Sequence, residues 1–472
     1  MRIKNTPAIQ NVKEVEAREW ISQKSESLRS IYWRRFKKHT LGKIGAVILL
    51  FLYFCAFFAD FLSPYTMTWT DKKKSYHPPT GIYWSYKDNG EKIFRPFSYE
   101  MMLTSAAFKT YSIIPPYSLR AISREPIPGV KELRSIATDK TAYARKQKIL
   151  SDVAGHYNLS RSHEAIQRLS KAIDEMESNK MDEVRIVFRV GTRKIVDDEE
   201  PLELILAKGN KNFLSFFYKG VSYRFLGLFT TRVHLFGSPT GGYYPLGADQ
   251  LGRDVLSRLL HGSRVSLSVG ILGALISFTL GLIIGGLAGY FGGIVDNILM
   301  RLSEIVIAFP AIYLLFTLRA TFPTSLTSIQ VYLLIVMILS AIGWAGLARI
   351  IRGLVLSIKN EDYVLSARTM GLSNWKLVRK HILPNTLSFV IIQVTISIPS
   401  YILGESSLSL LGLGINEPQA SWGLMLADAR NTRVMMQYPW ILIPGFAIFV
   451  AIMAWNFFGD GIRDAVDPRS KH

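Results

Sequence analysis

Few side chains of this sequence stand in an arrangement that supports catalysis or metal binding. No stretch has the form G-x-x-x-x-G-K-[ST], the loop that cradles nucleotide phosphates, so we expect no nucleotide hydrolysis by the chain itself. The eight histidines are scattered. His163 and Glu164 resemble the start of a zinc-binding helix, but the residue four positions after His163 is Gln167. We therefore expect no catalytic residue, no bound metal and no cofactor.

Glu405 is an acidic residue inside a long apolar run, and Ser406 follows it directly. A carboxyl group within a membrane span is costly and is a functional candidate by default. In one interpretation, Glu405 and Ser406 line a transport pathway or gate. In the other, Glu405 is hydrogen-bonded within the protein and holds the stretch GESSLS against a neighbouring helix.

A second charged group, Asp249, Arg253 and Asp254, precedes another apolar run. These residues either dock a partner protein or cap and brace the helix that follows them. An acid just before a helix favours the positive end of the helix dipole. Both interpretations place the three side chains at a membrane surface.

These charges matter because the chain has the composition of a membrane protein. It has 472 residues, a formal charge of +20 and 49% apolar residues, gathered in long runs with cationic flanks. About 20 apolar helical residues cross a bilayer core of about 30 Å. We expect six transmembrane helices, at Ile44–Leu62, Val265–Tyr290, Ser303–Ala320, Ile329–Leu347, Leu387–Leu411 and Tyr438–Gly459.

The third run is the weakest of the six because it carries charges near its ends. Arg301 and Glu304 are expected to pair with each other, and Arg319 is expected to extend its charged group to the membrane interface. In the second run, the glycines of GLIIGGLAGYFGG are expected to allow close helix packing.

Cations on the short flanks predict the orientation. They gather before the first run, in the loop 349–385 and after the sixth run, which places both termini and that loop in the cytoplasm. The aromatic and basic stretch 32–38 fits an interfacial anchor better than a nucleic-acid site. The expected organisation is a cytoplasmic segment 1–43, a first transmembrane helix 44–62, an extracytoplasmic insert 65–240, a membrane core 241–459 and a cytoplasmic tail 460–472.

The insert is expected to be a folded α+β unit. Residues 142–181 show helical periodicity. Short β-type runs follow at VRIVFRVG, LELILA, FLSFFYKG and YRFLGLF.

The loop between the fourth and fifth runs contains DYVLSARTMGLSNWKLVRKHILPN, residues 362–385. Asn360 is expected to cap a first short helix, which ends at Gly371 in the left-handed conformation. Ser373 is expected to cap a second helix, which Pro384 then closes.

Apolar side chains of this segment cannot be buried by two isolated helices in water. They need a cleft, which lipid headgroups or a partner protein would supply, and pattern alone does not choose between the two. The side chains concerned are Tyr363, Val364, Ala367, Met370 and Trp375.

The motif SARTMG…HILPN is similar to the EAA loop of ABC importer permeases. Four longer stretches agree: YPLGADQLGRDVLSRLLHGSRVSLSVG, GGIVDNILMR, GESSLSLLGLGINEPQASWG and FFGDGIRDAVDPR. They resemble the OppC/DppC-type permease subunit of peptide importers, as does the entry to the first run, WRRFKKHTLGKIGAVIL. The resemblance covers residues ~31–64 and ~240–470, and it implies the type I importer permease fold.

The resemblance implies that the segment 362–385 couples the permease to an ATPase. The residues assigned to this coupling loop are Tyr363, Ala367, Gly371, Trp375, Leu383 and Pro384. Two features depart from the family pattern. Leu365 stands where the family has a glutamate, and the insert is far longer than the usual outer loop.

The resemblance also implies the partners. A second, homologous permease encloses the pathway, two ATP-binding subunits act at the cytoplasmic face, and an extracytoplasmic binding protein delivers a peptide. The expected location is the bacterial or archaeal cytoplasmic membrane.

Three alternatives stay open at this point. The same machinery imports nickel or another small solute in related systems. An ion-coupled secondary transporter would need several carboxylates deep in the spans. A sensor receptor would need a cytoplasmic output domain, and the segment after Gly459 has only thirteen residues.

Overall fold

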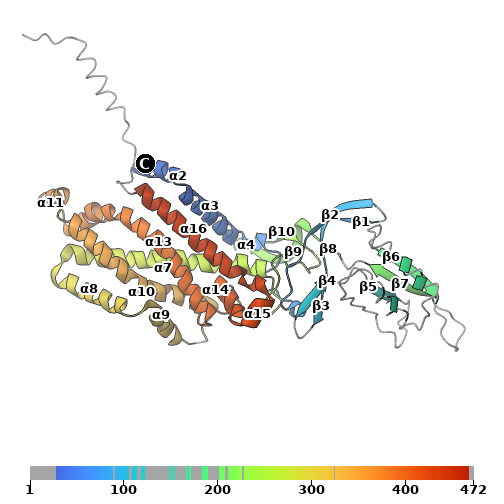
Figure 1. Cartoon of the computed structure of the whole chain (residues 1–472). Coiled ribbons are helices and arrows are strands. Elements are labelled where there is room, and N and C mark those ends of the chain that lie inside the picture. The colour runs from blue at the N-terminus through green and yellow to red at the C-terminus, as the bar shows by residue number, and fades with distance from the viewer. Residues whose placement is uncertain are drawn as a thin grey trace, which may run out of the picture.

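The protein consists of a helical bundle with a β-rich insert at one end (Figure 1). The computed structural model describes residues 28–88, 91–105, 109–113, 118–122, 183–189, 201–207, 211–225, 228–323 and 325–466, together with isolated helical positions between 147 and 171. We call the end of the bundle that carries the insert the insert end. The opposite end carries residues 349–385, which include two short helices joined by a turn. We call it the hairpin end.

The bundle is built from long apolar helices that lie side by side (Figure 1). Its helices are α2 (Leu28–Lys38), α3 (Thr40–Phe57), α4 (Ala59–Leu62), α7 (Val255–Phe291), α8 (Gly293–Ala308), α9 (Ala311–Ala320), α10 (Ser328–Ile358), α13 (Leu383–Leu410) and α16 (Ile443–Val466). Five helical stretches in the described residues are long and apolar enough to cross a membrane, and a sixth crossing requires a bent pair of helices. These helices confirm five of the six predicted spans, with shifted bounds.

The third predicted span is not one straight helix. It is broken into α8 and α9, whose axes differ by 86°. Phe309 adopts an extended backbone at the break, with φ −84° and ψ 132°. Pro310 explains this, because a proline disfavours helical backbone in the residue before it and donates no N–H of its own.

The second predicted span starts too late. Helix α7 begins at Val255, ten residues before the predicted Val265, because its first turns carry polar side chains that an apolar window does not count. The first predicted span is interrupted at Phe58, which separates α3 from the short helix α4.

Glycines bring α7 and α10 into backbone contact. A Cβ atom on Gly285 would lie 2.4 Å from the carbonyl oxygen of Ala348, and one on Gly289 would lie 2.8 Å from that of Arg352. The expectation that these glycines allow close helix packing is confirmed. Asp296 of α8 also contacts Arg352, with 2.5 Å between the carboxylate oxygens and the guanidinium nitrogens, and so joins α8 to α10.

The insert contains ten described strands in four antiparallel sheets. One three-stranded sheet has the order β1 (Tyr83–Asp88), β2 (Glu91–Tyr99), β8 (Lys211–Phe213). The other three-stranded sheet has the order β5 (Ser118–Ile122), β7 (Pro201–Ala207), β6 (Glu183–Arg189). The remaining two sheets are two-stranded hairpins, β3 (Met101–Ser105) with β4 (Thr110–Ile113) and β9 (Ser215–Phe225) with β10 (Phe229–Gly237).

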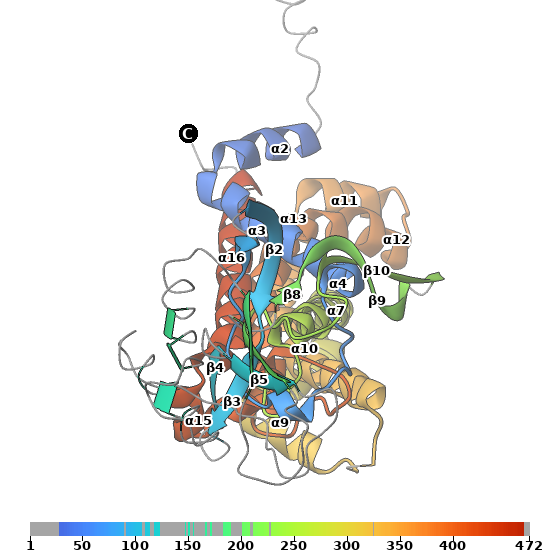
Figure 2. The same ribbon diagram turned by 90° about the vertical axis from the view of Figure 1, so that its right-hand side faces the viewer.

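Strands β6 and β7 occur at the first two predicted β-type runs, and the third run lies mostly in β9. The fourth run, YRFLGLF, covers the end of β9 and the first residue of β10 and is not a strand of its own, and β1 to β5 and most of β10 were not predicted. The predicted helix 142–181 lies outside the described residues, apart from isolated helical positions. The β9–β10 hairpin lies against the end of α4, between the bundle and the other sheets (Figures 1 and 2).

A pair of glycine-to-alanine substitutions tests the α7–α10 contact. Gly285→Ala is expected to lower the free energy of unfolding by about 1–3 kcal/mol, because the new methyl group meets backbone. Gly346→Ala is the matched control. Its Cβ would meet nothing within 4 Å, so it is expected to be neutral or to stabilise by up to about 1 kcal/mol. Thermal unfolding of the chain in detergent measures both, and equal shifts would contradict the contact.

Candidate functional site

Two short helices project from the bundle at the hairpin end, and we call them the hairpin. Helix α11 (Asp362–Thr369) is followed by Gly371, whose φ of +82° lies in the left-handed region that favours glycine. Helix α12 (Asn374–Leu377) comes next. The turn at Gly371 therefore has the predicted conformation.

The capping predictions are wrong in detail. Glu361, not Asn360, occupies the cap position of α11, and the Asn360 side chain instead donates to the carbonyl oxygen of Leu356 at 3.4 Å. Ser373 occupies the cap position of α12 with an extended backbone, but its side chain makes no capping hydrogen bond.

Pro384 does not close the second helix. A π-helical turn (Val378–Ile382) follows α12 and leads directly into α13, so a continuous helix extends from Asn374 to Leu410. Pro384 fits because the wider π turn directly before it changes the hydrogen-bond pattern at the position where proline cannot donate an N–H. The hairpin is thus continuous with a helix that reaches the insert end (Figure 1).

The inner face of the hairpin is buried against the rest of the chain. Val364 and Ala367 are 2% exposed, and Leu377 is fully buried. The cluster also contains Ile351, Val355, Val378, Ile382 and Val390. This corrects the expectation that Val364 and Ala367 need an external cleft, because α10 and α13 supply the cover.

Four large apolar side chains of the hairpin remain exposed. Exposed fractions are 74% for Met370, 65% for Trp375, 44% for Tyr363 and 43% for Leu365. We call these four side chains the exposed hairpin face.

Polar tethers hold the hairpin in place. The Asn385 side chain donates to the Tyr363 hydroxyl at 2.9 Å. The Tyr290 hydroxyl, at the end of α7, donates to the Asn374 side chain at 2.6 Å. Leu383 and Pro384 lie at the start of α13, so they join the hairpin to the long helix.

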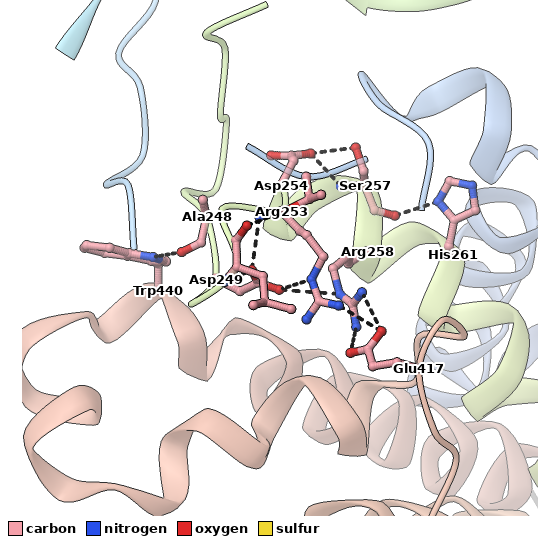
Figure 3. A network of polar contacts seen from close by, with 11 residues as sticks. Ala248, Asp249, Arg253, Asp254, Ser257, Arg258, His261, Glu417 and Trp440 are labelled. Atoms are coloured by element: carbon pink, nitrogen blue, oxygen red, sulfur yellow. Dashed lines mark hydrogen bonds and ion pairs between the residues drawn. The ribbon is translucent and has the colours of Figure 1, made fainter. Parts of the chain in front are cut away.

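At the insert end, Asp249 and Arg253 belong to a network of ion pairs (Figure 3). The Arg253 Nε atom lies 2.6 Å from an Asp249 oxygen, and its Nη1 atom lies 2.8 Å from Glu417. Arg258 donates to both oxygens of Glu417, at 3.1 and 3.3 Å. The network therefore joins the start of α7 to the loop that follows α13.

Arg258 and Glu417 were not predicted as site residues from the sequence. Arg258 and Glu417 lie 159 positions apart, so no local pattern links them. The spacing Asp254, Arg258, His261 places three polar groups on one face of a helix, and this was the available signal.

Asp254 caps helix α7. Its Oδ2 atom accepts from the backbone N–H of Ser257 at 2.7 Å and from the Ser257 hydroxyl at 2.6 Å. Burial raises the pKa of Asp254 to about 7, although the hydrogen bonds from Ser257 act in the opposite direction. These contacts are of the bracing kind, and a docking role for Asp249, Arg253 and Asp254 stays a prediction.

A third polar cluster joins α4 to α7. Asp60 lies 3.0 Å from His261 Nε2 and accepts from Arg264 at 2.7 Å. Arg264 also donates to the carbonyl oxygens of Ala56 and Phe57. The end of the first apolar helix is therefore fixed to the second.

Glu405 is fully buried in a cage of serines. Ser409 donates to it at 2.7 Å, Ser266 of α7 at 3.2 Å and Ser406 at 3.4 Å. Ser266 in turn accepts from the backbone N–H of Trp422 at 3.0 Å. The carboxylate thus lies between α13, α7 and the start of α14 (Trp422–Met425), which is the geometry of a structural brace.

The charged residues of the third predicted span differ in their partners and their burial. Arg301 and Glu304 pair at 3.0 Å, as expected. The Arg319 side chain does not extend outward to the membrane interface, contrary to expectation, because it is buried within the chain and only 4% exposed. Helix α9 turns at Pro310 and packs against α10.

Known proteins resemble the membrane part of the chain. The family model described as "Binding-protein-dependent transport system inner membrane component" matches residues 281–472. The model "N-terminal TM domain of oligopeptide transport permease C" matches residues 27–79.

Individual relatives give the same result. The dipeptide transport system permease protein DppC of Bacillus subtilis is 42% identical over 231 residues, which are 49% of this chain and 70% of that protein. The oligopeptide transport system permease protein OppC of Haemophilus influenzae is also 42% identical over 231 residues, 49% of this chain and 72% of that protein. A structure of the MetNI methionine ABC transporter aligns with a TM-score of 0.35 and 20% identity, over 44% of this chain and 96% of that chain, too distant a likeness for any argument.

Substitutions of Glu405 separate a bracing role from a pathway role. Glu405→Leu is expected to lower the free energy of unfolding by about 1–3 kcal/mol, because buried hydroxyl groups lose their acceptor. Glu405→Gln keeps one acceptor oxygen, and serine hydroxyls can reorient toward its amide, so most of the stability should return. Thermal unfolding is the measurement. Equal stability of all three proteins, with transport lost, would contradict the brace and favour the pathway.

Proposed function

This chain belongs to the family of binding-protein-dependent transport permeases, in the group of OppC and DppC subunits, and we propose that it forms half of the membrane pathway of an ABC importer for peptides. The names of the relatives, dipeptide and oligopeptide permeases, support peptides as the substrate class. Family membership supports the fold of type I importer permeases, with six crossings if α8 and α9 count as one bent span.

The observation that carries this function is the exposed hairpin face. Four large apolar side chains remain exposed on a segment whose other apolar side chains are already buried. We take these exposed side chains, which lie outside the long apolar helices, as candidates for a protein contact. We assign it to a cleft on an ATPase subunit, which supplies the ATP hydrolysis that this non-catalytic subunit lacks.

Cations support the orientation. Arg352, Lys359, Arg368, Lys376 and Arg379 cluster at the hairpin end. Short cytoplasmic loops are enriched in such residues. We therefore assign the hairpin end and both termini to the cytoplasm, and the insert to the outer side.

The long helix from Asn374 to Leu410 provides the mechanical link. Two ATPases that close on ATP would displace the hairpin, and the displacement would pass along α13. At the far end of α13 lie the Glu405 cage and the loop that carries Glu417. Different packing of these contacts in two states would open the pathway to one side or the other.

The remaining partners follow from the same reasoning. A second, homologous permease would complete the pathway as a heterodimer. A binding protein on the outer side would release the peptide into it, and a lipid bilayer would surround the apolar helices.

Removal of one exposed aromatic side chain tests the coupling role. Trp375→Ala is expected to reduce peptide uptake and peptide-stimulated ATPase activity of the reconstituted transporter about tenfold, because an interface anchor of this type contributes about 1.4 kcal/mol or more. Its abundance in the membrane should not change, since Trp375 is exposed.

Trp33→Ala is the matched control for Trp375→Ala. Trp33 lies in α2, is 58% exposed and is not part of the hairpin. Equal uptake by the two variants and the unsubstituted protein would reject the assignment of the hairpin to the ATPase.

For the insert, we propose that it contributes to the docking surface for the binding protein. Its position at the insert end, beyond the outer ends of α7 and α13, supports this role (Figure 1). A role in assembly alone is the competing interpretation.

Excision of the sheet β5–β7–β6 tests the docking role. Ser118 and Ala207 are direct partners across β5 and β7, so removal of residues 119–206 leaves two ends that a two-residue turn can join. The Kd of the binding protein is expected to rise about tenfold or more. Isothermal titration in detergent measures it, and Trp375→Ala should leave it unchanged. An unchanged Kd after the excision would reject docking by this sheet.

A further inference from the structure

A large cavity opens at the insert end of the bundle, apart from the hairpin and the Glu405 cage. Its volume is about 690 Å³, within the range of roughly 300–1,000 Å³ that is usual for ligand sites. Apolar side chains form much of its wall, among them Tyr53 and Phe57 of α3 and Leu267, Ile271 and Leu272 of α7.

Two arginines line the same cavity. Arg264 comes from α7 and Arg224 from β9. Arg264 donates to Asp60 and to two backbone carbonyls, yet 37% of its side chain stays exposed. Arg224 is exposed. Because Asp60 balances one guanidinium charge, the polar side of the cavity keeps a net positive charge.

The strand that carries Arg224 is firmly attached to the end of the membrane helix. The Tyr218 hydroxyl donates to the carbonyl oxygen of Pro64, and His234 Nδ1 lies 2.8 Å from the carbonyl oxygen of Ser63. The rings of Phe225 and Phe58 contact each other with centroids 6.0 Å apart. Arg224 is therefore held where α3 ends and not on a free loop.

Surrounding side chains place this cavity at a membrane surface. Phe54 and Phe57 of α3 are 50% and 54% exposed, and Phe229 of β10 is 58% exposed. Only 22% of the apolar 18-residue stretch of α3 is buried within the chain. Phenylalanine rings carry no polar group, so these exposed rings at the end of an apolar helix are suited to contact with lipid acyl chains.

We propose that this cavity is a binding site for a phospholipid of the adjacent leaflet. An acyl chain lies against Leu267, Ile271 and Leu272, and the headgroup phosphate lies between Arg224 and Arg264. Guanidinium groups suit this role because their N–H groups match the oxygens of a phosphate. A lipid fits better than a helix of the partner permease, because the cavity combines an apolar wall with a cationic rim and opens beside the exposed face of α3.

Native mass spectrometry of the purified full chain tests the site with three probes. Dioleoylphosphatidylglycerol has both acyl chains and phosphate, dioleoylglycerol lacks the phosphate, and glycerol phosphate lacks the acyl chains. The phospholipid is expected to bind at least about tenfold more tightly than either of the others. Equal binding of dioleoylglycerol would overturn the role of the arginines, and equal binding of glycerol phosphate would reduce the site to a free phosphate site.

Arg224→Ala is expected to weaken phospholipid binding about tenfold. Arg232→Ala is its matched control, because Arg232 is an exposed cation of the β9–β10 hairpin that does not line the cavity. Leu272→Trp should weaken binding by filling the cavity, with the thermal unfolding midpoint as a check on folding. Equal effects of Arg224→Ala and Arg232→Ala would overturn the proposal.

The assembled transporter distinguishes the other possible occupant. A photo-crosslinking side chain in place of Ile271 is expected to capture lipid. Capture of the second permease instead would show that a protein segment fills the cavity and would overturn the lipid assignment. Neither result depends on peptide transport, so the proposal stands or fails apart from the proposed function.

Discussion

The unbroken helix from Asn374 to Leu410 is the constraint on which the rest of the structure depends. At 1.5 Å per residue, its 37 residues extend over about 55 Å. One end is packed into the hairpin through Leu377 and Ile382, and the other holds Glu405 in its serine cage. The π turn at Val378–Ile382 and Pro399 inside α13 are the positions at which this helix can bend. A movement of the hairpin that is not taken up there changes the contacts that α13 makes at the insert end.

The two ends of the bundle are stabilised by different forces. Apolar contacts bury the inner face of the hairpin, and such contacts tolerate small displacements. At the insert end, Arg253 and Arg258 share Asp249 and Glu417, and the Arg258 side chain is only 3% exposed. Glu417 is 45% exposed, but the buried guanidinium of Arg258 is left uncompensated when its partners move away. The network therefore favours discrete arrangements over gradual ones.

The insert is joined to the membrane part through its own hairpin. The β9–β10 hairpin contacts residues 63 and 64 just after α4, while Asp60 of α4 pairs with His261 and Arg264 of α7. A continuous set of contacts thus leads from the sheets to the two helices that flank the proposed lipid site. The insert and the bundle are therefore joined directly beside the proposed lipid site.

Features that depend on neighbouring residues were predictable from the sequence. Apolar runs located five membrane helices, β-type runs located strands in the insert, and Gly371 located the turn of the hairpin, because hydrophobic length and backbone preference act over a few residues. Which faces are covered depends on the packing of distant segments in the folded chain. This packing buried Ala367 in a cluster with side chains of α10 and α13, buried Arg319 in α9, and paired Arg258 with Glu417 across 159 positions. Burial and ion pairing depend on which distant segments become neighbours in space, and no local pattern carries that information.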